Sequence, residues 1–142
     1  MQVLEMKFMH RWAPELLSLL RVMAAGSFFT HGTMKLFSWP VPFEHPMNGM
    51  LYVAGVLEVF GGILLIIGLF SRPISFILSG LMAFAYFIAH ASGGFFPVVN
   101  HGEAAMLYCF IFLYIAAAGP GSISVDALVG RSKRLQAVGD RA

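Results

Sequence analysis

Four apolar stretches alternate with short polar or proline-rich connections along this chain. They cover about residues 14–37, 48–70, 72–91 and 102–123. A helix needs about 20 apolar residues to cross a bilayer, and the second and third stretches reach that length with almost no charge. The pattern predicts an all-α protein, a four-helix transmembrane bundle that forms a single domain over residues 1–142, with a flexible basic tail from about residue 131.

Composition favours a membrane protein over a soluble bundle. The chain is 58% hydrophobic and 11% charged, with a mean hydropathy of +0.79. Soluble domains are usually about a quarter charged, and a soluble bundle carries a polar stripe on each helix. Ile63–Leu69 and Cys109–Ala118 are instead apolar on every side. A cleaved signal peptide is an alternative for the first stretch, but Arg21 would interrupt its apolar region.

Basic residues are restricted to alternate connections. Lys7 and Arg11 precede the first stretch, Arg72 lies in the turn between the second and third, and Arg131–Arg134 follow the fourth. The connections at 38–47 and 92–101 contain no Lys or Arg. Because basic residues collect on the cytoplasmic side, we expect both termini to be cytoplasmic, in a multi-pass protein of the cytoplasmic (inner) membrane of a bacterium.

The charge and cysteine content argue against nucleic-acid binding and against disulfide or dithiol chemistry within the chain. The formal charge is only +2 and no long basic run is interleaved with aromatic residues, so nucleic-acid binding is not indicated. Cys109 is the only cysteine, which excludes an intrachain disulfide and a dithiol mechanism within the chain. Its apolar neighbours favour an inert thiol. A redox role would therefore require another protein or a bound cofactor.

Glu58 lies in the middle of the second apolar stretch, where a carboxylate is costly unless it is paired, protonated or functional. Arg21, in the inner half of the first stretch, has a side chain long enough to reach that depth. We therefore expect a polar core formed by an Arg21–Glu58 pair. The pair has two interpretations, a functional group in the membrane or an ionic lock that fixes helix register. Neighbouring glycines such as Gly55 and Gly62 indicate close helix packing.

A second polar cluster is expected in the outer half of the bundle, as a ligand or proton site. His31 and Lys35 come from the first stretch, His90 ends a small and polar stripe on the third, and Asn100 and Glu103 begin the fourth. Histidine titrates near neutral pH, so the cluster suits proton transfer or ligand binding. Lys35 alone also fits a side chain that extends to the membrane interface.

The same histidines raise two cofactor alternatives. His31, His90, His101 and Glu103 offer metal-ligand chemistry, but their spacing matches no compact motif, so no metal site is predicted. A bis-histidine haem would need His31 and His90 at one depth on facing helices, and two histidines alone carry little information.

Several segments together resemble the DoxX family of small integral membrane proteins. They are, in chain order, Arg21 with Gly26–Phe37, then Leu57–Gly62 with Gly68 and Arg72-Pro73, then Asn100–Ala105, Leu107-Tyr108, Gly119–Ser122, Ser124 and Asp126. The first two groups are similar to the family's first-helix and second-helix signatures, and the rest to its last helix. One departure is His101, where the family pattern has glycine.

The resemblance implies a small four-helix membrane protein. Relatives act as the membrane subunit of thiosulfate:quinone oxidoreductase, and others are implicated in redox-stress complexes with sulfurtransferase or superoxide dismutase partners. It thus implies a quinone as cofactor and a soluble redox or sulfurtransferase protein as partner, beside the lipid bilayer. A homo-oligomer is a further possibility, because the sequence does not determine the oligomeric state. The positions carried over are Arg21, His31, Lys35, Glu58, His90, Asn100 and Glu103.

The leading hypothesis is a membrane subunit of a quinone-linked or redox-stress complex. The outer cluster would bind a quinone carbonyl through His31 or His90, and Glu103 or Glu58 would carry the proton. Two alternatives stay open. A non-catalytic scaffold would recruit soluble partners through its inner surface, and a small-solute or proton permease would use the polar interior, although the chain lacks inverted repeats. Whether the protein is itself an enzyme stays open as well.

Overall fold

The computed structural model describes residues 7–139, and every regular element in that range is helical. In chain order these are α1 (Lys7–Phe37), α2 (Gly49–Ile67), α3 (Ser71–Ala85), the π-helical turn η1 (Tyr86–His90), the 3₁₀ turn η2 (Ala91–Gly93), α4 (Pro97–Asn100), α5 (Glu103–Ala118) and α6 (Val125–Gly139). The prediction of an all-α fold is confirmed.

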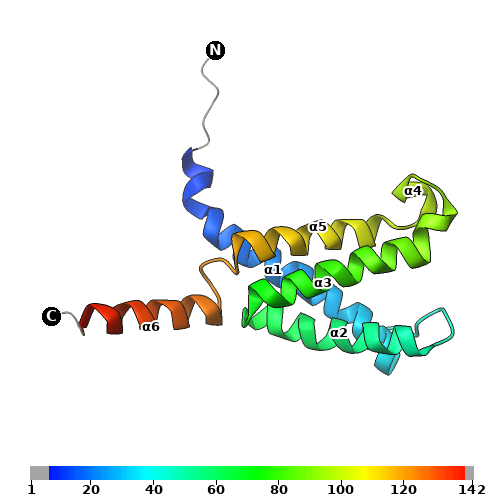
Figure 1. The fold of residues 1–142 in the computed structure, drawn as a ribbon, viewed down its shortest axis with the longest axis horizontal. Coiled ribbons are helices and arrows are strands. Elements are labelled where there is room, and N and C mark those ends of the chain that lie inside the picture. Colours follow the sequence, from blue (N-terminus) through cyan, green and yellow to red (C-terminus); the bar gives the residue numbers. More distant parts are fainter. Residues whose placement is uncertain (1–6, 140–142) are drawn as a thin grey trace, which may run out of the picture.

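Helices α2, α3 and α5 run roughly parallel, and α1 crosses them obliquely (Figure 1). α1 packs along α2, α3 packs along α5, and α2 and α3 also contact each other. The α2–α3 turn, the α5–α6 connection and the start of α1 lie at one end of the bundle, here called the inner end. The α1–α2 connection and α4 lie at the other, the outer end. α6 extends away from the inner end.

Two helical stretches of the described residues are long and apolar enough to cross a membrane. They are Gly49–Ile67, with a mean hydropathy of 2.3, and Ser71–Gly93, with 1.8, which is α3 continued by η1 and η2. α5 is apolar but has only 16 residues, and α1 contains charged residues along its length. That all four helices cross the bilayer stays a prediction.

The fourth predicted stretch is shorter than expected. The sequence pattern extends it to residue 123, whereas α5 ends at Ala118. Gly119 and Gly121 both have positive φ, +103° and +82°, and Pro120 lies between them. These conformations end the helix, because a left-handed glycine cannot continue it and proline lacks the amide donor. The structure has helix α6 through the region of the predicted flexible tail as far as Gly139, and the flexibility of this tail stays a prediction.

Aromatic and aliphatic side chains fill the centre of the bundle. Phe28 of α1 packs edge-on against Phe112 of α5, with ring centroids 4.9 Å apart, and tilted against Tyr108 at 5.3 Å. The buried core cluster consists of Ala24, Ala25, Phe28, Leu65, Leu78, Met82, Phe112 and Ile115.

The outer surface of the bundle is also apolar. Large side chains point outward from several helices, including Phe60 on α2, Phe76 on α3, Phe87 on η1 and Phe110 on α5, each more than 60% exposed. Soluble monomers rarely expose apolar patches larger than a few hundred Å². A surface of this kind is suited to lipid chains, in which the helical backbone satisfies its own hydrogen bonds.

α1 and α2 approach each other closely along a line of glycines. A Cβ atom added to Gly32 would lie 2.8 Å from a Val59 methyl carbon and 2.9 Å from the Gly55 carbonyl oxygen. At Gly62 it would lie 2.9 Å from Cβ of Phe29. Small residues at these positions allow the two backbones to touch, and this contact brings polar side chains of α1 next to those of α2.

Replacing Gly32 should separate the two helices. Gly32→Ala should lower the free energy of unfolding by about 1–3 kcal/mol, because the added methyl group meets backbone as well as side chain. The matched control is Gly26→Ala, where a Cβ meets nothing within 4 Å, and which should be neutral or stabilising by up to about 1 kcal/mol. Thermal unfolding in mild detergent measures both. Equal effects of the two substitutions would contradict this helix packing.

Candidate functional site

Glu58 forms an ion pair with Lys35. Nζ of Lys35 lies 2.5 Å from Oε1 of Glu58, and the two side chains are 12% and 2% exposed. α1 contributes the cation from its last turn, and α2 contributes the carboxylate from its midpoint. Gly55 accommodates the stem of Lys35, since a Cβ there would lie 3.3 Å from Cβ of Lys35. Lys35 also lies 5.6 Å from the ring centroid of Phe43, within the range of a cation–π contact.

The carboxylate of Glu58 is only partly satisfied. Oε1 accepts the hydrogen bond from Lys35, but Oε2 is buried and has no hydrogen-bond partner in the protein. A buried acceptor without a partner costs on the order of 1–3 kcal/mol. Unsatisfied polar atoms of this kind are unusual in native proteins and are found at catalytic and strained sites.

The prediction that Arg21 pairs with Glu58 is wrong. The Arg21 side chain is buried, but its guanidinium donates to the carbonyl oxygens of Leu65 at 2.8 Å and Ile123 at 2.6 Å. It lies against Gly68, whose left-handed conformation (φ +73°) ends α2. Arg21 therefore stabilises the C-terminus of α2, where carbonyl groups are unpaired and the helix dipole favours a cation.

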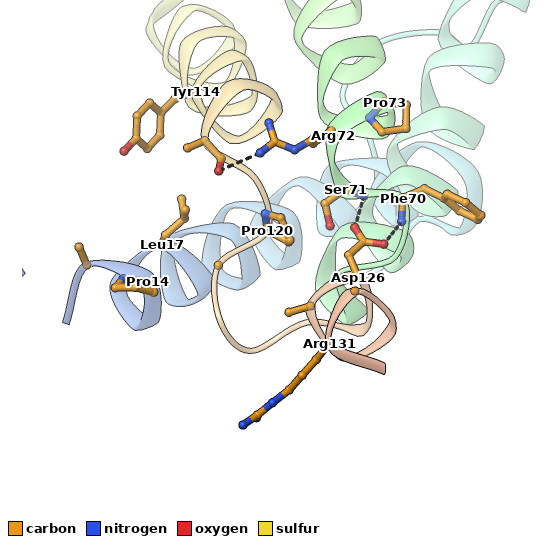
Figure 2. A pocket seen from close by; sticks show the side chains of 15 residues that line it. Pro14, Leu17, Phe70, Ser71, Arg72, Pro73, Tyr114, Pro120, Asp126 and Arg131 are labelled. Atoms are coloured by element: carbon orange, nitrogen blue, oxygen red, sulfur yellow. Dashed lines mark hydrogen bonds between the residues drawn. The ribbon is translucent and has the colours of Figure 1, made fainter. Parts of the chain in front are cut away.

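Two more charged residues bind helix ends at the inner end. Arg72 donates to the last carbonyls of α5, those of Ala116, Ala117 and Ala118. Asp126, in the first turn of α6, accepts hydrogen bonds from the amides of Phe70 and Ser71 at the start of α3, at 2.9 and 2.8 Å (Figure 2). Each charge has the sign that the helix dipole favours at that terminus. These contacts join α5 and α6 to the α2–α3 turn.

Asn100 organises a separate polar group at the outer end. Its buried side chain donates to the hydroxyl of Tyr86 at 3.1 Å and to the Gly94 carbonyl at 2.9 Å, and it accepts from the Gly102 amide at 2.8 Å. Nδ1 of His90 lies 3.1 Å from the Asn100 carbonyl oxygen. The group therefore fixes the connection between η1 and α5.

His101 follows Asn100 with a positive φ of +58°. Glycine adopts this left-handed conformation at little cost, which agrees with the glycine that the resemblance leads us to expect at this position.

His31 lies between the ion pair and the aromatic core. Its exposed side chain is one helical turn before Lys35 on α1, and its ring is edge-on to Tyr108 at 6.1 Å. The hydroxyl of Tyr108 donates to Oγ of Ser27 at 2.6 Å. A polar line therefore follows α1 from Ser27 through His31 to Lys35 and crosses to Glu58.

The predicted outer cluster is thus divided. Lys35 and His31 belong to the α1–α2 side, whereas His90 and Asn100 belong to the connection between η1 and α5. Among the described residues no hydrogen bond or ion pair joins the two groups, and Glu103 is exposed at the start of α5. In residues 7–139, no three His, Cys, Asp or Glu side chains lie close enough together to hold a metal ion.

Sequence reasoning missed several of these contacts. Tyr86 lies on the small and polar stripe that ends at His90, but the sequence pattern does not pair it with Asn100, and it does not identify Arg72 or Asp126 as a helix cap. A signal was available for Asp126, since acidic residues favour helix N-termini. Nothing in the sequence indicates that the N-terminus it binds belongs to α3, 55 residues earlier.

Comparison with known proteins places this chain in a family. The DoxX family model matches residues 16–91. An uncharacterized protein of Haemophilus influenzae is 43% identical over 129 residues, which cover 85% of this chain and 96% of the relative. No solved structure matches. With its long apolar helices, the chain is an all-helical protein of a membrane family, and it associates with the lipid bilayer. It belongs to the DoxX family.

A double-mutant cycle tests the partner of Glu58. Lys35→Met should destabilise the protein by about 3 kcal/mol, because it leaves a buried carboxylate without its cation. In the double variant with Glu58→Gln, the loss should be smaller than the sum of the single losses by about 1–3 kcal/mol. The control cycle, Arg21→Met with Glu58→Gln, should be additive. Thermal unfolding in detergent measures both cycles, and coupling confined to the Arg21 cycle would refute the assignment.

Proposed function

We propose that this protein is the integral membrane subunit of a quinone-linked or redox-stress complex. The observation that carries the proposal is the buried Lys35–Glu58 pair, which has one unpartnered carboxylate oxygen and an exposed imidazole one helical turn away. Ionisable groups inside a membrane protein are costly and generally mark ligand sites or proton pathways.

The proposed topology has four spans, with both termini in the cytoplasm of a bacterium. Two features support it. The start of α1 and the start of α6 lie at the inner end of the bundle (Figure 1), as an even number of spans requires. Arg11, Arg72 and Arg131 also belong to this end, in keeping with the positive-inside rule. The Lys35–Glu58 site then lies in the outer half of the membrane.

His31 would hold the quinone head group, because its imidazole can donate a hydrogen bond to a carbonyl oxygen and is open to the lipid-facing surface. The unpartnered Oε2 atom of Glu58 and the ammonium group of Lys35 provide a proton acceptor and donor behind it. A quinone supplies a two-electron, two-proton acceptor when bound. The electrons would come from a soluble redox partner, and Glu58 and Lys35 would return protons to His31.

A second candidate function is a non-catalytic scaffold for soluble partners. The observation that favours it is that Arg21, Arg72 and Asp126 all bind helix ends at the inner end. These charges fix the positions of the helix ends and do not form a reactive centre. The two candidates differ in one respect, because a scaffold needs no quinone at His31.

The quinone content of the purified protein distinguishes the two functions. Protein extracted in mild detergent should retain quinone, detected by solvent extraction and absorbance. In His31→Phe the retained quinone should fall about tenfold, because one hydrogen bond to the head group is lost. The matched control is His10→Phe, which changes an exposed histidine near the start of α1, far from His31 along the helix, and should retain the wild-type amount. Equal retention in His31→Phe and wild type would overturn the assignment of His31.

A further inference from the structure

A cleft of about 1070 Å³ opens at the inner end, away from the Lys35–Glu58 site. Its walls come from the first part of α1, the start of α3, the end of α5 and the first turns of α6 (Figure 2). Pockets for small-molecule ligands typically measure about 300–1,000 Å³, so this cleft is large enough to hold such a ligand.

Two arginines give the cleft a positive charge. Arg72 is exposed, and its guanidinium is held in place by three hydrogen bonds to the carbonyls that end α5. A guanidinium has five N–H donors, so two remain for a ligand. Arg131 extends from α6 at the rim. Asp126 also lines the cleft, but its carboxylate accepts hydrogen bonds from the backbone amides at the start of α3. Two cations against one carboxylate leave a net charge of +1.

The remaining walls are mostly apolar. Pro14 and Leu17 of α1, Tyr114 of α5 and Pro120 of the connection line the cleft beside the arginines. An occupant that satisfies both kinds of wall must combine an anionic group with a hydrocarbon part. Leu128 of α6 is 67% exposed, as expected for a helix that lies at a membrane surface with its apolar residues toward the lipid.

We propose that this cleft binds an anionic phospholipid of the cytoplasmic leaflet. Arg72 contacts the phosphate, Arg131 at the opposite rim adds positive charge around the head group, and an acyl chain lies along Leu17 and Tyr114. Arginine suits this role because its planar donors match the oxygens of a phosphate group. A lipid in this cleft would lie against both the bundle and the first turns of α6. The proposal requires the membrane placement of the chain but not the quinone at His31.

The test measures thermal stability of the full chain in mild detergent as lipid is added. Phosphatidylglycerol should raise the unfolding temperature, because a ligand that binds only the folded state stabilises it. Phosphatidylcholine with the same acyl chains should have little effect. In Arg131→Gln the phosphatidylglycerol concentration at half-maximal effect should rise about fivefold, which corresponds to the contribution of one basic residue at an anionic surface.

Arg11→Gln is the matched control, since Arg11 is an exposed basic residue of α1 that does not line the cleft. It should keep the wild-type response. An unchanged response in Arg131→Gln would overturn the proposal, as would an equal loss in Arg11→Gln. Inorganic phosphate is tested alone, and stabilisation by phosphate equal to that by phosphatidylglycerol would assign the site to a free anion instead of a lipid.

Discussion

The ion pair between Lys35 and Glu58 is the interaction on which the rest of this structure depends. A carboxylate near the middle of an apolar helix is tolerated only with a cation at hand, and the cation comes from another helix. The two side chains meet because Gly32 and Gly55 let the backbones of α1 and α2 approach. A larger residue at either position would separate the charges. Helix packing and site chemistry are therefore set by the same contact.

Charged residues have different roles at the two ends of the bundle. At the inner end Arg21, Arg72 and Asp126 bind backbone groups at helix termini, so their charges are used to join helices. In the outer half, Glu58 keeps a buried oxygen free of partners while Lys35 neutralises its charge. Charges bound to backbone carbonyls and amides are suited to a structural role, whereas the free carboxylate oxygen of Glu58 can still accept a proton. This contrast is why the proposed chemistry is assigned to the outer half.

Much of the fold could be predicted from the sequence. The length of the apolar stretches predicted the extents of α2 and of α3 with η1 closely, because glycines with positive φ, Gly68 and Gly94, lie near their ends. The need of Glu58 for a cation also followed from its position. Which of the two cations, Arg21 or Lys35, pairs with Glu58 did not follow from the sequence. Both lie on α1, and the pairing depends on how that helix is rotated and shifted along α2. Arg21 instead donates hydrogen bonds to the carbonyl oxygens of Leu65 and Ile123. The turn at Gly68 and the connection after α5 bring these two carbonyls together. Contacts between distant segments of this kind have no local signature.

The measurement that tests the central claim most directly is the distance between the Lys35 ammonium nitrogen and the Glu58 carboxylate carbon in the bilayer. Solid-state NMR dipolar recoupling on ¹⁵N-lysine and ¹³C-glutamate protein can measure it, in a Lys7→Arg, Lys133→Arg background that leaves Lys35 as the only lysine. The structure predicts strong dephasing of the lysine nitrogen signal that disappears in Glu58→Gln. Absence of dephasing, or dephasing that persists in Glu58→Gln, would contradict it.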